Sequence, residues 1–127
     1  MSKSEIEKIA SRRYSSIKSR VNYDLEKHWK RIDFIKWYIK EDKTCCYCGI
    51  TEEEALDFYE SKNVEGTKRI KRGKSLEIER IEDKEYTPDN CKLACYWCNN
   101  AKSDVFTFVE FKTIGKEIGK VIRSKLI

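Results

Sequence analysis

Two short cysteine motifs constrain the fold of this 127-residue chain more than any other feature. The first pair, Cys45 and Cys48, lies in CCYCG, and the second pair, Cys95 and Cys98, lies in CYWC. A spacer of two residues lets both thiolates of a pair turn toward one ion, and four thiolates about 2.3 Å from Zn²⁺ make a closed tetrahedral site. The sequence therefore predicts a structural zinc site that ties residue 45 to residue 98, which a core this small would not hold alone.

The chain has six cysteines, so Cys46 and Cys91 lie outside this pattern. Cys46 could replace Cys45 as a ligand, although its C-x-C spacing to Cys48 is less usual, and Cys91 is expected in the core. Two other interpretations remain open: the thiols could be small buried apolar groups, or one pair could be a thioredoxin-like redox centre. Zinc is favoured over both because the N-terminal residues contain no export signal, and a reducing compartment keeps thiols free to bind metal.

Composition limits the class of protein. Charged residues and hydrophobic residues each make up 39% of the chain, and fifteen residues are aromatic. That apolar content excludes a disordered or collagen-like chain, and no apolar run reaches the ~20 residues that a membrane-spanning helix needs. We therefore expect a single cytoplasmic domain, residues 1–127, with no membrane contact.

Charge is unevenly distributed along the chain, although the formal net charge is only +5. Residues 1–31 carry nine basic and four acidic side chains, residues 32–61 carry three and eight, and residues 62–74 carry six and one. Two basic segments on either side of an acidic one favour local binding of a polyanion, while an ordinary solvated surface explains the charges equally well. The candidate phosphate contacts are Arg12, Arg13, Lys71, Arg72 and Lys74.

Periodicity and capping signals predict two helices in the first third of the chain. Residues 4–21 repeat apolar side chains every three or four positions, and Ser4 with Glu7 matches a capping box. A second helix is expected at about 30–41. Its buried face is expected to hold Ile32, Ile35, Trp37, Tyr38 and Ile39.

Two further helices are marked by capping boxes, in which a Thr side chain and a Glu three residues later bond each other's backbone. A box at 51–54 begins a helix at about 52–61, and a second at 107–110 begins one at about 108–125. The last helix carries an apolar stripe of Phe108, Phe111, Ile114, Ile118, Val121 and Ile122. Its Gly115 and Gly119 either let another element approach closely or are tolerated at some cost in helix stability.

A strand carboxylate and a helix amide near the second cysteine pair suggest a second metal site. Residues 75–81 alternate as a strand, which places Glu79 on the face opposite Ile78. Asn99 follows Cys98 at the expected start of a short helix, and Lys102 lies one turn further on, where it could meet a phosphate. A carboxylate and an amide that face each other make an oxygen-only cation site, which suits Mg²⁺. Taken singly, each of these residues is more often a solvated Glu, a capping Asn or a surface Lys.

The segment 45–104 resembles the HNH endonucleases that carry two C-x-x-C zinc knuckles. The pattern is a knuckle, a strand with an acidic residue, a turn with Asn, and a second knuckle followed by Asn-x-x-Lys. Besides the four cysteines, the matching residues here are Glu79, Arg80, Asn90, Asn99 and Lys102. The resemblance implies an α+β fold of the ββα-metal type, flanked by a helical N-terminal extension (1–41) and a C-terminal helix (105–127). It also implies hydrolysis of phosphodiester bonds in DNA, with double-stranded DNA as the expected partner.

Carried over onto this chain, the family pattern gives Glu79 and Asn99 as ligands of a catalytic Mg²⁺ or Mn²⁺, and Asn90 as the brace of the hairpin loop. The chain departs from the pattern at Arg80, where the family has its general-base His, because Arg does not give up its proton. Arg80 can instead clamp a phosphate with two hydrogen bonds. The alternative bases are Glu77, Glu82, Asp83, the poorer candidate Tyr86, and the sole histidine His28.

Three functions are compatible with these residues. The first is a metal-dependent DNA endonuclease with Arg80 as a phosphate clamp. The second is a zinc-stapled nucleic-acid-binding module that has lost catalysis, which the missing His supports. The third, a protein-interaction zinc module, leaves Glu79, Asn99 and Lys102 without a purpose. One site of this type cuts one strand at a time, so both a monomer and a homodimer are compatible with the sequence.

Overall fold

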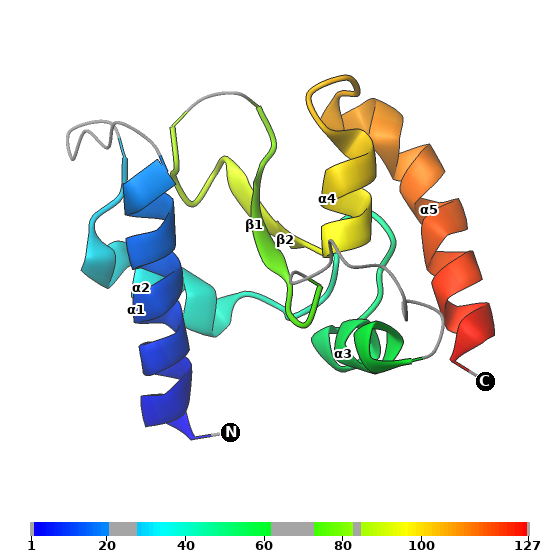
Figure 1. Ribbon diagram of the computed structural model, residues 1–127. Coiled ribbons are helices and arrows are strands. Elements are labelled where there is room, and N and C mark those ends of the chain that lie inside the picture. Colours follow the sequence, from blue (N-terminus) through cyan, green and yellow to red (C-terminus); the bar gives the residue numbers. More distant parts are fainter. Residues whose placement is uncertain (1, 21–27, 62–72, 83–84, 127) are drawn as a thin grey trace.

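The computed structural model describes residues 2–20, 28–61, 73–82 and 85–126. Within these ranges it contains five helices and one antiparallel pair of strands (Figure 1). The elements are α1 (Lys3–Arg20), α2 (Arg31–Lys40), α3 (Glu52–Glu60), β1 (Glu77–Arg80), β2 (Cys91–Ala94), α4 (Tyr96–Lys102) and α5 (Phe108–Lys125). The hairpin lies in the middle of the molecule, with α1 and α2 on one side and α3, α4 and α5 on the other (Figure 1). No helix in the described residues is long and apolar enough to cross a membrane.

The short hairpin decides which side chains face which helices. β1 pairs with β2 so that Glu77 lies opposite Ala94 and Glu79 lies opposite Lys92. Because side chains alternate along a strand, Glu77 and Glu79 share one face and Arg80 points to the other. The face that carries the two carboxylates packs against α4.

Helices α1 and α2 enclose an aromatic core that differs in part from the predicted one. Phe34 and Tyr38, one turn apart on α2, are buried against α1, and Phe34 contacts the rings of Tyr14 and Trp29. Ile32, which we expected in the core, is 58% exposed. The apolar pattern of this helix is nearly continuous, so it could not tell which stripe faces α1.

The N-terminus of α1 is capped by a different residue from the predicted one. The helix begins at Lys3, and the Ser2 hydroxyl accepts a hydrogen bond from the backbone N–H of Glu5 (3.2 Å). The predicted cap, Ser4, lies inside the first turn. Ser2 with Glu5 and Ser4 with Glu7 have the same spacing, so local sequence alone could not choose between them.

Helix α5 begins and ends where the sequence predicted, and the predicted capping boxes of α3 and α5 are both present. The buried face of α5 is narrower than expected, because Ile114 and Val121 are exposed by 39% and 55%. Its centre is formed by Gly115 and Gly119, which lie directly against the first cysteine knuckle. The close-approach interpretation of these glycines is therefore correct.

We expect Gly119→Ala to lower the free energy of unfolding by about 1–3 kcal/mol, because a Cβ added there would lie 2.5 Å from the backbone oxygen of Cys48. Alanine normally stabilises a helix by up to about 1 kcal/mol relative to glycine, so the expected sign is opposite to that of helix propensity. Urea denaturation of the zinc-loaded protein measures the effect. Lys116→Ala, on the exposed side of the same helix, is the matched control. A more stable Gly119→Ala variant would contradict the close packing of α5 on the knuckle.

Candidate active site

The four cysteines of the two knuckles converge on one point between distant parts of the chain. Their sulfur atoms all lie within 4.8 Å of one another, all four residues are buried, and Cys48 Sγ is 3.7 Å from Cys95 Sγ. Ligands about 2.3 Å from a tetrahedral Zn²⁺ lie about 3.8 Å apart, so the cluster has the size of a zinc site. Four thiolates and no oxygen ligand are a soft donor set that favours zinc over Mg²⁺ or Ca²⁺. Cys45, Cys48, Cys95 and Cys98 are the residues that would hold it.

The backbone of each knuckle is shaped to present its sulfur atoms. The N–H of Cys48 donates to Cys45 Sγ (3.5 Å), and the N–H of Cys98 donates to Cys95 Sγ (3.4 Å). Cys95 is also the N-cap of α4, so the metal cluster fixes the start of that helix. Hydrogen bonds from the neighbouring thiols lower the pKa of Cys45, and the bond with Cys45 raises the pKa of Cys98. Cys98 therefore keeps its proton in the metal-free cluster, and binding of a metal ion as thiolates would release protons.

Cys46 and Cys91 lie outside the cluster, which decides between Cys45 and Cys46 as the ligand. The N–H of Cys46 donates to the carbonyl of Leu93 (2.8 Å), which joins the knuckle to β2. Cys91 is buried on β2, as expected for a core residue. Burial raises the pKa of the Cys91 thiol to about 12 and also raises that of Cys46, so both are uncharged at neutral pH.

Glu79 is buried, only 8% exposed, on the face of β1 that packs against α4. Its Oε2 accepts a hydrogen bond from the Tyr47 hydroxyl (2.9 Å) and lies 3.9 Å from the Lys102 ammonium. Burial raises the pKa of Glu79, while Tyr47, Lys102 and Arg80 oppose that shift. Both contacts involve Oε2, and no side chain in the described residues hydrogen-bonds to Oε1, which makes it the candidate metal ligand.

Lys102 and Tyr47 both contact Glu79 in a way that the sequence did not indicate. Lys102 is buried, with 9% of its side chain exposed, and its charge faces Glu79 inside the protein. Tyr47 lies in the two-residue spacer of the first knuckle and was not singled out in the sequence. Its hydroxyl has a raised pKa because of burial and the adjacent carboxylate, so it acts as the donor in the bond to Glu79. The knuckle therefore positions both the zinc ligands and the candidate carboxylate.

Asn99 reaches the same region from α4. The helix begins at Tyr96, so Asn99 lies at the end of the first turn rather than at the helix start. Its Nδ2 donates to Glu77 Oε1 (3.0 Å), and within the described residues no direct bond joins it to Glu79. An ionised carboxylate only accepts hydrogen bonds, so Glu77 selects the NH₂ side of the amide and leaves Oδ1 for another partner. The sequence pattern did not reveal this role of Glu77.

Arg80 lies on the opposite face of β1, where its guanidinium carbon lies over the Tyr86 ring, 4.7 Å from the ring centroid. His28 contacts the same residue: its Nδ1 accepts the N–H of Tyr86 (2.9 Å), and the two ring centroids are 5.8 Å apart. The sole histidine therefore joins the hairpin through Tyr86. Residue 28, shortly before α2, thus lies on the Arg80 side of the hairpin.

Asn90 holds the loop that follows β1. Its side chain donates to the carbonyls of Glu82 and Glu85 and accepts the N–H of Glu82, each at 3.0 Å. Its carbonyl also accepts the N–H of Ile81 (2.8 Å). Glu82, a candidate base, is exposed in this loop, whereas the candidate Asp83 lies outside the described residues.

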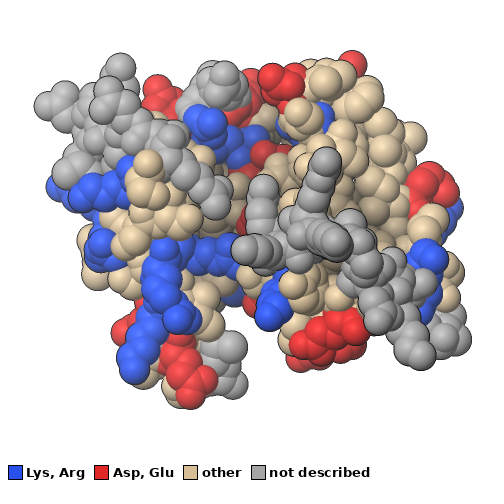
Figure 2. All heavy atoms as spheres, viewed as in Figure 1, with Lys and Arg blue, Asp and Glu red and all other residues tan. Residues whose placement is uncertain are grey.

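The predicted phosphate contacts are dispersed over the surface beside α1 and the segment before β1. Arg12 is exposed, while Arg13 is half-buried and hydrogen-bonds to the Ser75 hydroxyl. Lys74 is exposed and lies 5.4 Å from the ring centroid of Tyr59. Lys71 and Arg72 lie outside the described residues. Figure 2 shows blue side chains along α1 with red ones at its lower end, and a red group over α3, so basic and acidic side chains are only partly separated on this face.

Comparison with solved structures places this geometry in a known class. The fold is similar to that of the rare-cutting HNH restriction endonuclease PacI, with a TM-score of 0.68 and 24% identity, over 98% of this chain and 82% of that chain. No protein-family model and no curated protein matches the sequence. The chain has the fold of an HNH endonuclease, with a cluster of four cysteines that could hold a metal ion, and the predicted α+β class is confirmed.

Proposed function

We propose that this protein is a metal-dependent endonuclease that hydrolyses phosphodiester bonds in double-stranded DNA. The observation that carries the proposal is that the contacts of β1 and α4 engage Glu79 Oε2 and Asn99 Nδ2, which leaves Glu79 Oε1 and Asn99 Oδ1 as the candidate ligands of a cation. One carboxylate and one amide oxygen, with positions left for water and phosphate, suit Mg²⁺ or Mn²⁺. The HNH restriction endonuclease PacI, described as perturbing DNA, has a similar fold, which supports DNA as the substrate.

Each residue has a role that its contacts support. Glu79 and Asn99 would hold the divalent ion, which would supply Lewis-acid stabilisation of the phosphate charge and of the leaving oxygen. Tyr47 and Lys102 hold the Glu79 carboxylate in place, and Lys102 compensates its buried charge. Arg80 would clamp a phosphate oxygen, and its guanidinium lies over the Tyr86 ring. Asn90 would keep the loop after β1 in position.

The proposed reaction has no histidine base at the family position. General-base help contributes about 10²–10⁴-fold, so an enzyme that relies on the metal, Arg80 and a solvent or carboxylate base would be slow but measurable. A single site cuts one strand at a time. We therefore expect nicking by the monomer, and double-strand cleavage only by two successive cuts or by a homodimer.

A second candidate function is a zinc-stapled DNA-binding module without catalysis. It is favoured by Arg80 in place of the family His, because a guanidinium cannot take a proton from water. Such a module would bind DNA in a salt-dependent way through its basic side chains.

A plasmid assay separates the two functions. Supercoiled plasmid is incubated with the zinc-loaded protein and Mg²⁺ or Mn²⁺, and conversion to the open-circular form is followed over hours. The endonuclease proposal predicts nicking that requires the added ion. Salt-dependent DNA binding without nicked product under either metal would instead identify the binding module.

A further inference from the structure

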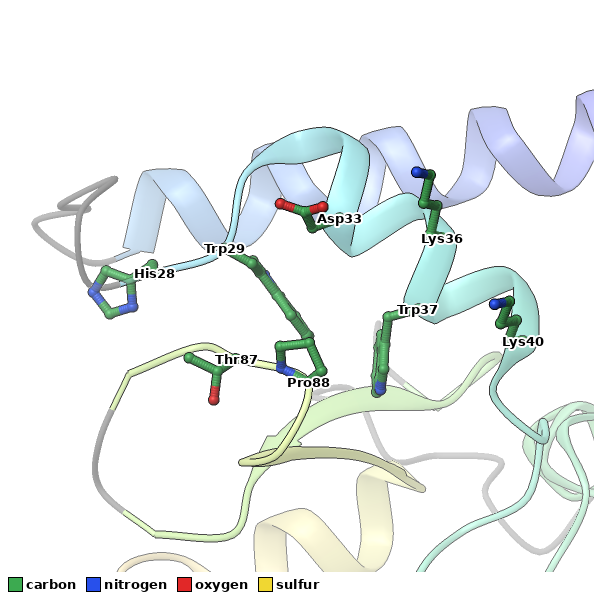
Figure 3. Close-up of a pocket in the computed structure, with 8 residues that line it drawn as sticks. All are labelled: His28, Trp29, Asp33, Lys36, Trp37, Lys40, Thr87 and Pro88. Atoms are coloured by element: carbon green, nitrogen blue, oxygen red, sulfur yellow. The ribbon is translucent and has the colours of Figure 1, made fainter.

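A groove lies between α2 and the loop that follows β1, on the side of the hairpin away from the Glu79 face. Its volume is about 480 Å³, within the ~300–1,000 Å³ of small-ligand pockets. The Trp29 side chain extends to Pro88, the Trp37 ring points from α2 toward the hairpin beside them, and the three side chains form the apolar wall of the groove (Figure 3). Trp29 is buried, so Trp37, which is half-buried, offers the accessible aromatic surface.

The outer edge of the groove is mainly basic. Lys36 and Lys40 lie one helical turn apart on α2, and both are exposed. Asp33 is the one acidic residue among the groove-lining residues. An aromatic surface beside two ammonium groups is the combination with which proteins bind unpaired nucleotides: the base stacks and the phosphates meet the cations.

The groove is also connected to the candidate active site. His28 lines one end of it and contacts Tyr86, the ring on which the Arg80 guanidinium rests. Pro88 belongs to the loop that Asn90 braces. A DNA strand with one phosphate on Arg80 would therefore have the groove along its path.

We propose that this groove binds an unpaired nucleobase of the DNA, stacked on Trp37, with neighbouring phosphates on Lys36 and Lys40. The inference rests on the proposed function in taking DNA as the substrate. It adds a site for a base outside the duplex, on the opposite face of β1 from the metal ligands.

The test compares two duplexes that differ only in a central run of unpaired thymines, using fluorescence anisotropy without added Mg²⁺ or Mn²⁺. Stacking of one base corresponds to an affinity gain of roughly tenfold, so the zinc-loaded protein should prefer the duplex with unpaired bases by about that factor. Trp37→Leu should remove the preference, and Trp37→Phe should keep most of it. Lys36→Ala with Lys40→Ala should reduce the slope of log affinity against log salt by about 1.4, because each lost single-strand phosphate contact removes about 0.7.

Lys116→Ala with Lys120→Ala, two exposed lysines of α5, is the matched control and should change neither quantity. Because Trp37 packs against Trp29 and Phe34, its variants are checked by thermal unfolding, and the exposed lysine pair tests the groove independently of folding. Equal binding of both duplexes by the wild type would overturn the groove proposal and leave the nuclease proposal intact. An unchanged salt slope for Lys36→Ala with Lys40→Ala would also overturn it. So would a Trp37→Leu variant that keeps the preference for unpaired bases and changes only the self-association of the protein. No binding of either duplex would contradict both proposals.

Discussion

Glu79→Gln should reduce metal-dependent plasmid nicking by at least about 100-fold, the usual cost of losing a key electrostatic group in an active site. Glutamine has nearly the same shape and can still accept the hydrogen bond from Tyr47, so the fold around the knuckle should be kept. What is lost is the charge that would hold a divalent ion and that balances the buried Lys102 ammonium. Initial rates of nicking at several Mn²⁺ concentrations measure the change.

A second measurement separates metal binding from chemistry. The electron paramagnetic resonance signal of free Mn²⁺ measures how much of the ion is bound. The wild-type protein should bind one Mn²⁺ ion, and Glu79→Gln should bind it with clearly lower affinity. Glu117→Gln, an exposed carboxylate on α5, is the control and should behave as the wild type in both experiments. Wild-type nicking rates in Glu79→Gln would refute the assigned site.

Cys95→Ser should unfold the protein at room temperature. Cys95 belongs to the cluster that joins the two knuckles and is the N-cap of α4, so its loss removes one of the four groups that would tie residue 45 to residue 98 through zinc. Structural zinc contributes about 10–16 kcal/mol in small domains, which equals or exceeds the ~5–15 kcal/mol stability of a typical folded protein. Circular dichroism should show loss of the helical signal, and mass spectrometry of the purified protein should show no bound zinc.

Cys46→Ser is the matched control, since Cys46 lies in the same knuckle but outside the cluster. It should bind one zinc ion and unfold cooperatively. A strong chelator added to the wild type should reproduce the Cys95→Ser result. A folded, zinc-free Cys95→Ser protein would mean that the hydrophobic core alone holds the two knuckles together.

The four-cysteine cluster could be predicted because the spacing of the two cysteines within each pair largely determines the geometry that a metal ion requires. Two residues between cysteines fix how a pair of thiols can turn, and this holds whatever surrounds them. The capping boxes of α3 and α5 could be predicted for the same reason, since each uses groups only three residues apart. The acidic strand was also placed correctly, whereas the short helix at the second knuckle begins at Tyr96, earlier than predicted.

The contacts that position the candidate site depend on packing, and a single sequence does not encode them locally. Tyr47 meets Glu79 only because the knuckle folds over β1, and Gly115 makes room for that tyrosine on α5. Lys102 is buried because α4 lies against the hairpin, whereas its flanking sequence is typical of a solvent-exposed helix end. In α2, Phe34 rather than Ile32 is buried because α1 covers only one of two apolar stripes.

Anomalous diffraction from crystals soaked in Mn²⁺ tests the central claim most directly, because it locates soft and hard cations separately in one molecule. At the zinc edge, we expect a peak among Cys45, Cys48, Cys95 and Cys98. At a wavelength where manganese scatters strongly, a second peak should lie between Glu79 and Asn99, with an oxygen of each as ligand. Manganese bound elsewhere, with those two oxygens uncoordinated at saturating Mn²⁺, would contradict the assignment of a catalytic metal to this hairpin.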